Sequence, residues 1–338
     1  MNTPREPLAT GPNGRPIRPF VMPASFTGKL WVWRYLLLRR VVQLGILLLF
    51  LGTVRWGWEV AGRPLLSGNL SASELLGAIP LADPFAVLQI ILTRHLPQPE
   101  VLIGAGIILL VYLLLGGRSW CAWVCPVNMV TDLAAWLRRR LGISDLFHLS
   151  RNIRYTVLAL ALVLSALIGV AAFEWISPIS MLHRELIFGV GLGWTAVLGV
   201  FLLDLFILRN GWCGHLCPLG AFYALVGRLA QVRVRFDTPT CTHCGECARV
   251  CPEPQVLNLK AAAATGMIAS GECSNCGRCI TVCPENTLHF DFRHFINTRE
   301  KTAKPYPAKG EQHEYHPVSR HAWTDLRSRR KCPRRGCR

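Results

Sequence analysis

The sequence is poor in charged side chains. Only 17% of its 338 residues are Asp, Glu, Lys or Arg, whereas soluble domains carry about 25%. A disordered chain is excluded, because 51% of the residues are apolar. One large soluble globule is also disfavoured, and the composition predicts segments that face lipid.

Several cofactor motifs are missing as well. There is no C-x-x-C-H segment, which excludes covalently bound c-type haem, and no nicotinamide or flavin fingerprint. The first 30 residues lack the apolar stretch of a cleavable signal peptide. The sequence thus predicts no covalent haem and no nicotinamide or flavin site in this chain.

Four apolar runs predict transmembrane helices. Each has 17 to 23 residues, long enough to cross a hydrocarbon core of about 30 Å at about 1.5 Å per residue. A fifth apolar stretch, residues 75–92, contains Pro80 and Pro84, so we expect it to lie at the interface or re-enter the membrane surface. The four runs are residues 41–58, 101–117, 155–173 and 186–208.

Acidic residues are scarce, with 20 Asp and Glu against 37 Lys and Arg, and their distribution predicts an orientation. Basic flanks alternate with acidic ones along the four runs, and basic flanks stay in the cytoplasm. We expect a multi-pass protein of the bacterial inner membrane, with both termini and all cysteine motifs inside. The net charge of +17 is then mainly an orientation signal rather than an affinity for nucleic acid.

Two copies of C-x2-C-x2-C-x3-C-P, 32 residues apart, carry the strongest chemical signal. This spacing is typical of two-cluster bacterial ferredoxins, in which the fourth cysteine of each motif binds the other [4Fe–4S] cluster. Zinc ribbons use paired C-x2-C motifs and not three closely spaced cysteines followed by C-P. Disulfides need an oxidising compartment, and this segment is predicted to lie in the cytoplasm. The predicted ligands are Cys241, Cys244, Cys247 and Cys283 for the first cluster, and Cys273, Cys276, Cys279 and Cys251 for the second.

A shorter motif, C-x3-C-P, occurs twice with an offset of 92 residues, after the second and fourth apolar runs. The chain therefore looks like two related halves of two spans each. If the cysteines are helical, each pair lies on one helix face, and four thiols converge on an iron site or a thiol–disulfide relay. The four are Cys121, Cys125, Cys213 and Cys217, with His215 as a further possible ligand and with Cys332 and Cys337 left without a role.

The predicted fold class is an α-helical membrane protein of four transmembrane helices in two pseudo-repeated halves, followed by an α+β ferredoxin-like domain with two [4Fe–4S] clusters. The expected domains are a cytoplasmic basic segment (1–34), the membrane domain (35–230), the ferredoxin-like domain (231–295) and a basic, flexible tail (296–338).

Together these segments resemble a known family. GNLSASELLGAIPLADPFAVLQ, GGRSWCAWVCPVNMVTDLAAWLRRRLG, NGWCGHLCPLGAFYALVG and CTHCGECARVCPEPQVL closely resemble the NapH/MauN family of integral-membrane ferredoxin-type proteins. The resemblance runs from about residue 34 to residue 290, and the long basic tail departs from it. The C-x3-C-P motif is shared more widely, with NosR and CcoG.

The resemblance implies a quinol dehydrogenase subunit that works with a NapG-like periplasmic iron–sulfur protein and a NapC-like multihaem cytochrome, passing electrons toward periplasmic nitrate reductase. The alternative is a MauN- or CcoG-like redox factor that supplies electrons for metal-cofactor assembly. Oxidising quinol needs a proton acceptor near an apolar slot. The candidates are Asp83, His95, Glu174 and His183 on the outer side and Asp204 near the inner side.

Overall fold

The computed structural model describes residues 15–18, 20–147, 149–189, 191 and 193–293. The whole of the predicted basic tail (296–338), including Cys332 and Cys337, and residues 1–14 lie outside the described residues.

The longest helix, α1 (Phe26–Trp56), has 31 residues. It begins where Ser25 caps it by accepting a hydrogen bond from the backbone N–H of Gly28, and it ends at Gly57 in the left-handed conformation (φ +63°). Among the described residues it is the one helix long and apolar enough to cross a membrane. It starts 15 residues before the apolar run predicted from Val41, because Leu and Arg residues continue the helix toward its N-terminus.

The remaining apolar helices are shorter than a full span, with 10 to 17 residues each. Helices α3 (Pro99–Leu115) and α6 (Ile153–Ile168) coincide with the second and third apolar runs. The fourth run was wrongly predicted as one continuous helix. It is divided between α8 (Pro178–Phe188) and α9 (Gly193–Leu202), because Gly189 ends α8 in the left-handed conformation (φ +67°).

The segment between α1 and α3 folds into small sheets and a buried helix. The antiparallel pair β1–β2 is followed by the three-stranded sheet β3–β4–β5, whose last strand runs into α2. Asp83 caps α2, and Pro84 starts it, so the chain turns sharply and α2 packs against α3 and α6. Its buried Phe85 has ring contacts with Phe173 and Phe222. The bounds are β1 Glu59–Val60, β2 Arg63–Pro64, β3 Leu66–Gly68, β4 Ala72–Leu75, β5 Ile79–Ala82 and α2 Pro84–Leu92.

The C-terminal described part has the α+β organisation expected for it. Strands β6 (Val232–Phe236) and β7 (Leu288–Phe292) pair antiparallel with Val234 opposite Phe290, and they enclose both cysteine motifs. Their apolar side chains pack with Ile268 and Ile280 into a small core. The helical segments between them are short: η3 Thr238–Thr240, α11 Glu246–Val250, η4 Pro254–Val256, α12 Leu259–Thr265 and α13 Arg278–Thr281.

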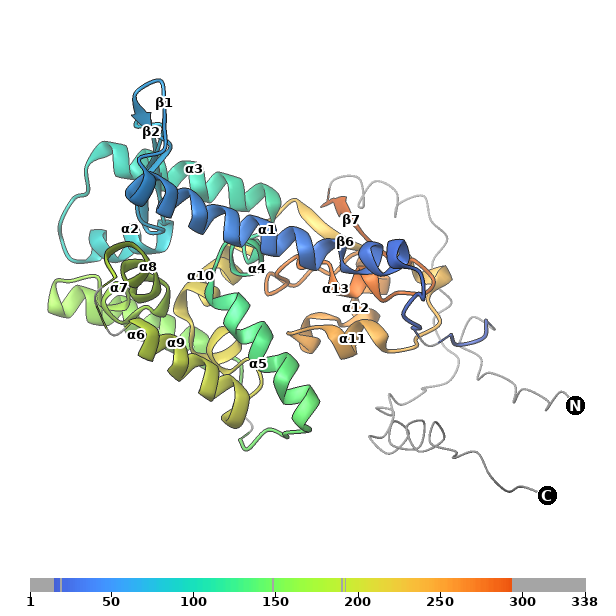
Figure 1. Ribbon diagram of the computed structural model, residues 1–338. Coiled ribbons are helices and arrows are strands. Elements are labelled where there is room, and N and C mark those ends of the chain that lie inside the picture. Colours follow the sequence, from blue (N-terminus) through green and yellow to red (C-terminus); the bar gives the residue numbers. More distant parts are fainter. Residues whose placement is uncertain (1–14, 19, 148, 190, 192, 294–338) are drawn as a thin grey trace, which may run out of the picture. The chain divides into compact units, whose positions relative to one another are not determined.

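Helix α1 contacts α13 of the ferredoxin part (Figure 1). The other helical segments before β6 are α4 Ser119–Trp123, α5 Val127–Leu141, α7 Ala172–Ile176, η1 Leu203–Ile207, η2 Trp212–Leu216 and α10 Pro218–Gly227.

Two glycines set how closely α10 approaches the ferredoxin part. A Cβ atom at Gly227 would lie 2.5 Å from the carbonyl oxygen of Gly271, and one at Gly271 would lie 2.2 Å from that of Ala224. Backbone therefore meets backbone here, with no room for a methyl group.

We expect Gly227→Ala to lower the free energy of unfolding by about 1–3 kcal/mol, because the added methyl group overpacks this contact. The matched control is Gly106→Ala in α3, where nothing lies within 4 Å of the added carbon and helix propensity improves. Thermal unfolding in detergent measures both variants. Equal melting temperatures for the two would show that the close contact does not form.

Candidate functional site

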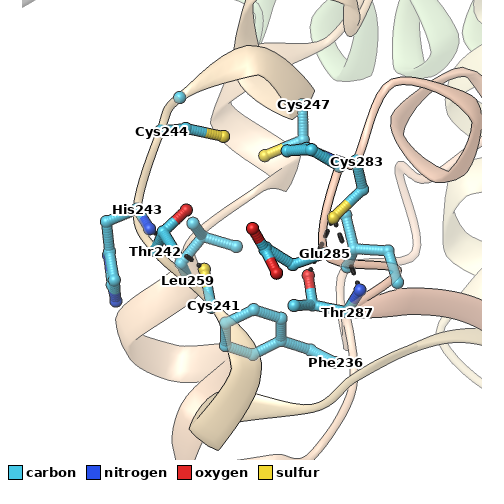
Figure 2. A pocket seen from close by; sticks show the side chains of 13 residues that line it. Phe236, Cys241, Thr242, His243, Cys244, Cys247, Leu259, Cys283, Glu285 and Thr287 are labelled. Atoms are coloured by element: carbon cyan, nitrogen blue, oxygen red, sulfur yellow. Dashed lines mark hydrogen bonds between the residues drawn. The ribbon is translucent and has the colours of Figure 1, made fainter. Parts of the chain in front are cut away.

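The first group of cysteines lines one pocket of about 370 Å³ in the ferredoxin part. Cys241, Cys244 and Cys247 come from the first motif, and Cys283 comes from the second (Figure 2). Backbone N–H groups of His243 and Thr287 donate to the sulfurs of Cys241 and Cys283, both at 3.4 Å. Such N–H donors stabilise negatively charged sulfur.

The second group lines a separate pocket of about 410 Å³. Cys273, Cys276 and Cys279 come from the second motif, and Cys251 comes from the first. Each pocket thus gathers three thiols from one motif and the fourth from the other. Thiol donors with N–H groups directed at them fit iron–sulfur clusters.

The loops of the two motifs share an unusual backbone. His243 and Asn275 occupy equivalent positions and both have positive φ (56° and 48°). The glycines two residues later, Gly245 and Gly277, have φ of 75° and 73° and begin α11 and α13. This repeated left-handed geometry curls each loop around its pocket.

The structure places the C-x3-C-P cysteines (Cys121, Cys125, Cys213 and Cys217) near one another, so that each thiol affects the electrostatics of the other three. The condition that both cysteines of a pair are helical is not met, because only the first lies in a helix, α4 or η2. Cys125 and Cys217 lie instead at the bend before the proline that starts the next helix.

His215 lies between the second pair of these cysteines, but its contacts are elsewhere. Its Nδ1 atom is 3.4 Å from the carbonyl oxygen of Asn210, and its ring is buried near Arg151 and Glu253.

A buried carboxylate, Glu253, lies where the ferredoxin part meets the C-x3-C-P cysteines. It follows Cys251 by two residues and forms ion pairs with three arginines of the helical part. The distance from Glu253 Oε1 is 3.0 Å to Arg118 Nη1 and 3.6 Å to Arg154 Nη1, and Arg151 contacts the other carboxylate oxygen. Burial raises the pKa of Glu253, but the three guanidinium groups outweigh it and hold that pKa below its usual value.

Arg118 connects the two sets of cysteines directly. Its guanidinium group, 3% exposed, donates to the carbonyl oxygens of Glu272 (3.0 Å) and Cys213 (3.1 Å), and it also bonds to the thiol of Cys121. Glu272 precedes Cys273, so one side chain touches segments next to both the C-x3-C-P cysteines and the second pocket.

A second group of charged side chains also joins the ferredoxin part to the helical part. Asp132 on α5 contacts Arg39 and Arg40 of α1, and it also contacts Arg278, which lies between two cysteines of the second pocket. Asn275 adds hydrogen bonds to the carbonyl oxygen of Leu115 at the end of α3 (3.0 Å). Residues of the second cysteine motif therefore contact the helical part, although both pockets are lined by residues of the ferredoxin part alone, 236–288 for the first and 234–279 for the second.

The five candidate proton acceptors for quinol are not brought into one site. Asp83 accepts hydrogen bonds from the start of α2 and from the Tyr223 hydroxyl (2.9 Å). Asp204 accepts from the N–H of Trp212 (3.0 Å), and the nearby Arg209 donates to the carbonyl oxygen of Cys251. Of the other three candidates, Glu174 accepts hydrogen bonds from the hydroxyl groups of Ser71 and Ser180, and His95 contacts Thr93. The ring of His183 packs edge-on against that of Phe50.

The fold and these pockets define a class of protein: an iron–sulfur electron-transfer protein of the ferredoxin type. The sequence matches the family model described as a 4Fe-4S binding domain over residues 98–144 and 187–237. A second model, a 4Fe-4S dicluster domain, matches residues 233–284. The first match covers both C-x3-C-P motifs, and the second covers the ferredoxin motifs.

Similar proteins of known name identify the family within this class. The methylamine utilization ferredoxin-type protein MauN of Methylorubrum extorquens is 48% identical over 70% of this chain and 81% of its own length. The ferredoxin-type protein NapH is 45% identical in Haemophilus influenzae (67% of this chain, 79% of the relative) and 44% in Escherichia coli (66% and 77%). No solved structure matches. The chain belongs to the NapH/MauN family of ferredoxin-type proteins.

Substitution of the buried Arg118 tests whether this charge cluster joins the ferredoxin part to the helical part. We expect Arg118→Gln to lower the free energy of unfolding by about 3–5 kcal/mol, because it leaves a buried charge cluster without one partner. Arg118→Lys should recover part of this loss by retaining the charge without the two-pronged geometry. Thermal unfolding in detergent measures both variants.

The matched control is Arg249→Gln, since Arg249 is 52% exposed and pairs with Glu246 on the surface of α11. Its expected cost is about 0–1 kcal/mol. If Arg118→Gln were no more destabilising than this control, the charge cluster would not hold the two parts together.

Proposed function

We propose that the chain is the membrane-bound relay of a quinol dehydrogenase and passes electrons from the quinol pool toward a periplasmic nitrate reductase. The observation that carries this proposal is the pair of four-thiol pockets, with the motif of the second pocket joined to the end of α3 through Asn275 and to α5 through Arg278. The membership in the NapH/MauN family supports the same role.

In this proposal the eight ferredoxin cysteines hold two [4Fe–4S] clusters. Cys241, Cys244, Cys247 and Cys283 hold one; Cys251, Cys273, Cys276 and Cys279 hold the other. When bound, each cluster carries one electron at a time. A quinol that becomes a quinone releases two electrons and two protons, so two clusters match the electron count.

The same proposal places four helices across the bacterial inner membrane, with the cysteine motifs on the cytoplasmic side. The charge distribution along the sequence supports this orientation. A short span such as α3 would then be completed by the residues that flank it. A NapG-like iron–sulfur protein and a NapC-like multihaem cytochrome would be its partners on the periplasmic side.

The assembly role is not favoured. The relatives' names describe ferredoxin-type proteins, and none of those reported above assigns its bearer to cofactor insertion. An assembly factor needs a second protein as its substrate, whereas the two cysteine pockets suit an electron relay without one.

Reduction by quinol tests the proposed function. We expect anaerobically purified protein in detergent to be reduced by a short-chain quinol and to show the EPR signals of two reduced cubane clusters. The variant Cys241→Ser/Cys244→Ser should lose one of the two signals, whereas Cys332→Ser should keep both. If dithionite produced both signals and quinol alone or with partner proteins produced neither, the quinol dehydrogenase role would be excluded.

Reporter fusions test the orientation separately. Alkaline phosphatase is active only where its disulfides form, outside the cytoplasm. We expect a fusion at the C-terminus to be inactive and a fusion after Gly77, between β4 and β5, to be active. The reverse pattern would contradict the inside placement of every cysteine motif.

A further inference from the structure

The sulfur of Cys283 makes two hydrogen bonds with one residue, Thr287 (Figure 2). The Cys283 Sγ atom lies 3.1 Å from the hydroxyl oxygen of Thr287 and 3.4 Å from its backbone nitrogen. A cysteine binds iron as the thiolate, which has no proton to give, so both groups of Thr287 donate to it. Thr287 is 2% exposed, and water therefore does not compete for this contact.

A tight turn after Cys283 positions Thr287. The N–H of Asn286 donates to the carbonyl oxygen of Cys283 (3.3 Å), and Asn286 has a positive φ of 51°. Asn is one of the few residue types that adopt this left-handed conformation readily. The turn returns the chain toward the cysteine, so that the N–H and the hydroxyl group of Thr287 reach the same sulfur.

The sheet of the ferredoxin part then holds the backbone of Thr287. Its carbonyl oxygen accepts a hydrogen bond from the N–H of Asp237 (2.9 Å). The next residue, Leu288, begins β7 and pairs with Phe236 of β6. With the backbone fixed in this way, the position of the hydroxyl group depends on a single side-chain torsion.

The first motif lacks this arrangement at the equivalent position. With the offset of 32 residues between the motifs, Asn286 and Thr287 correspond to Pro254 and Gln255. The ring of proline holds φ near about −65°, so the same left-handed turn cannot form after Cys251. The chain begins the short turn η4 there instead.

The side chain of Gln255 has other partners. Its amide group donates to Glu253 Oε2 (2.6 Å) and to Glu272 Oε2 (3.1 Å), within the charge cluster around Arg118. In the part of the chain that the structure describes, no hydroxyl group bonds to Cys251. The two pockets therefore have the same four-cysteine composition but differ in one hydroxyl donor.

We propose that Thr287 sets the reduction potential of the first cluster separately from that of the second. Reduction adds one electron, and therefore negative charge on sulfur, while no bond forms or breaks and the hydroxyl proton stays on its oxygen. The two donors of Thr287 stabilise this added charge through Cys283, so they favour the reduced form and raise the potential. This role rests on the two clusters of the proposed function and not on quinol as the electron donor.

A redox titration tests this role. The full-length protein, purified anaerobically in detergent, is titrated with dithionite and mediators while EPR follows each cluster. The signal that is absent from Cys241→Ser/Cys244→Ser belongs to the first cluster. Thr287→Val removes the hydroxyl group at nearly constant volume and should make reduction of this cluster about tenfold less favourable, which lowers its midpoint by about 59 mV for one electron. Thr287→Ser keeps a hydroxyl group and should restore most of the shift.

The matched control is Thr281→Val. Thr281 lies two residues before Cys283, but its hydroxyl group donates to the carbonyl oxygen of Arg278 (2.9 Å) and not to sulfur. We expect this variant to leave both midpoints unchanged. Thr287→Val should likewise leave the midpoint of the second cluster unchanged.

An unchanged first midpoint in Thr287→Val would overturn the role of Thr287, and so would an equal shift in Thr281→Val. If Thr287→Val lost the first cluster, Thr287→Ala would be titrated in its place, because it removes the hydroxyl group without adding an apolar branch. The titration contains no quinol, so an unchanged midpoint leaves the quinol dehydrogenase role standing. Conversely, a protein that quinol does not reduce still gives both midpoints with dithionite.

Discussion

The buried carboxylate of Glu253 carries the largest group of charges where the ferredoxin part meets the helical part. A charge at this depth would be costly by several kcal/mol without partners. Arg118, Arg151 and Arg154 come from the helical part and supply those partners, so this contact needs both parts folded. The same arginines keep the carboxylate ionised at neutral pH by holding its pKa low.

The position of Glu253 also orders the cysteine sites. It follows Cys251, and Arg118 extends from it to Cys121 and Cys213, so the second pocket lies beside the C-x3-C-P cysteines. Cys279 of the second pocket lies within electrostatic range of Cys247 in the first. The second ferredoxin pocket therefore neighbours both the C-x3-C-P cysteines and the first pocket.

The sequence predicted best what depends on local spacing. The exchange of the fourth cysteine between motifs follows from a short loop, a turn of helix and a proline, and the structure gathers the same eight thiols in the same two groups. The convergence of the C-x3-C-P cysteines was predictable from the repeat. Its local geometry was not, because the proline bend takes the second cysteine out of the helix.

What the sequence did not reveal depends on long-range contacts or on glycine. Arg118 and Glu253 are 135 residues apart in the chain, and only tertiary packing makes them partners, so no local pattern indicates the pair. The break of the fourth apolar run depends on Gly189, whose left-handed backbone outweighs the hydrophobicity of its neighbours.

The most direct measurement of this account is a double-mutant cycle on Arg118 and Glu253. Arg118→Gln, Glu253→Gln and the double variant would be compared by thermal unfolding in detergent. Residues in one buried network show interaction energies of about 0.5–3 kcal/mol, and we predict about 2 kcal/mol here. Additivity of the two substitutions to within about 0.3 kcal/mol would contradict the claim that this contact joins the ferredoxin part to the helical part.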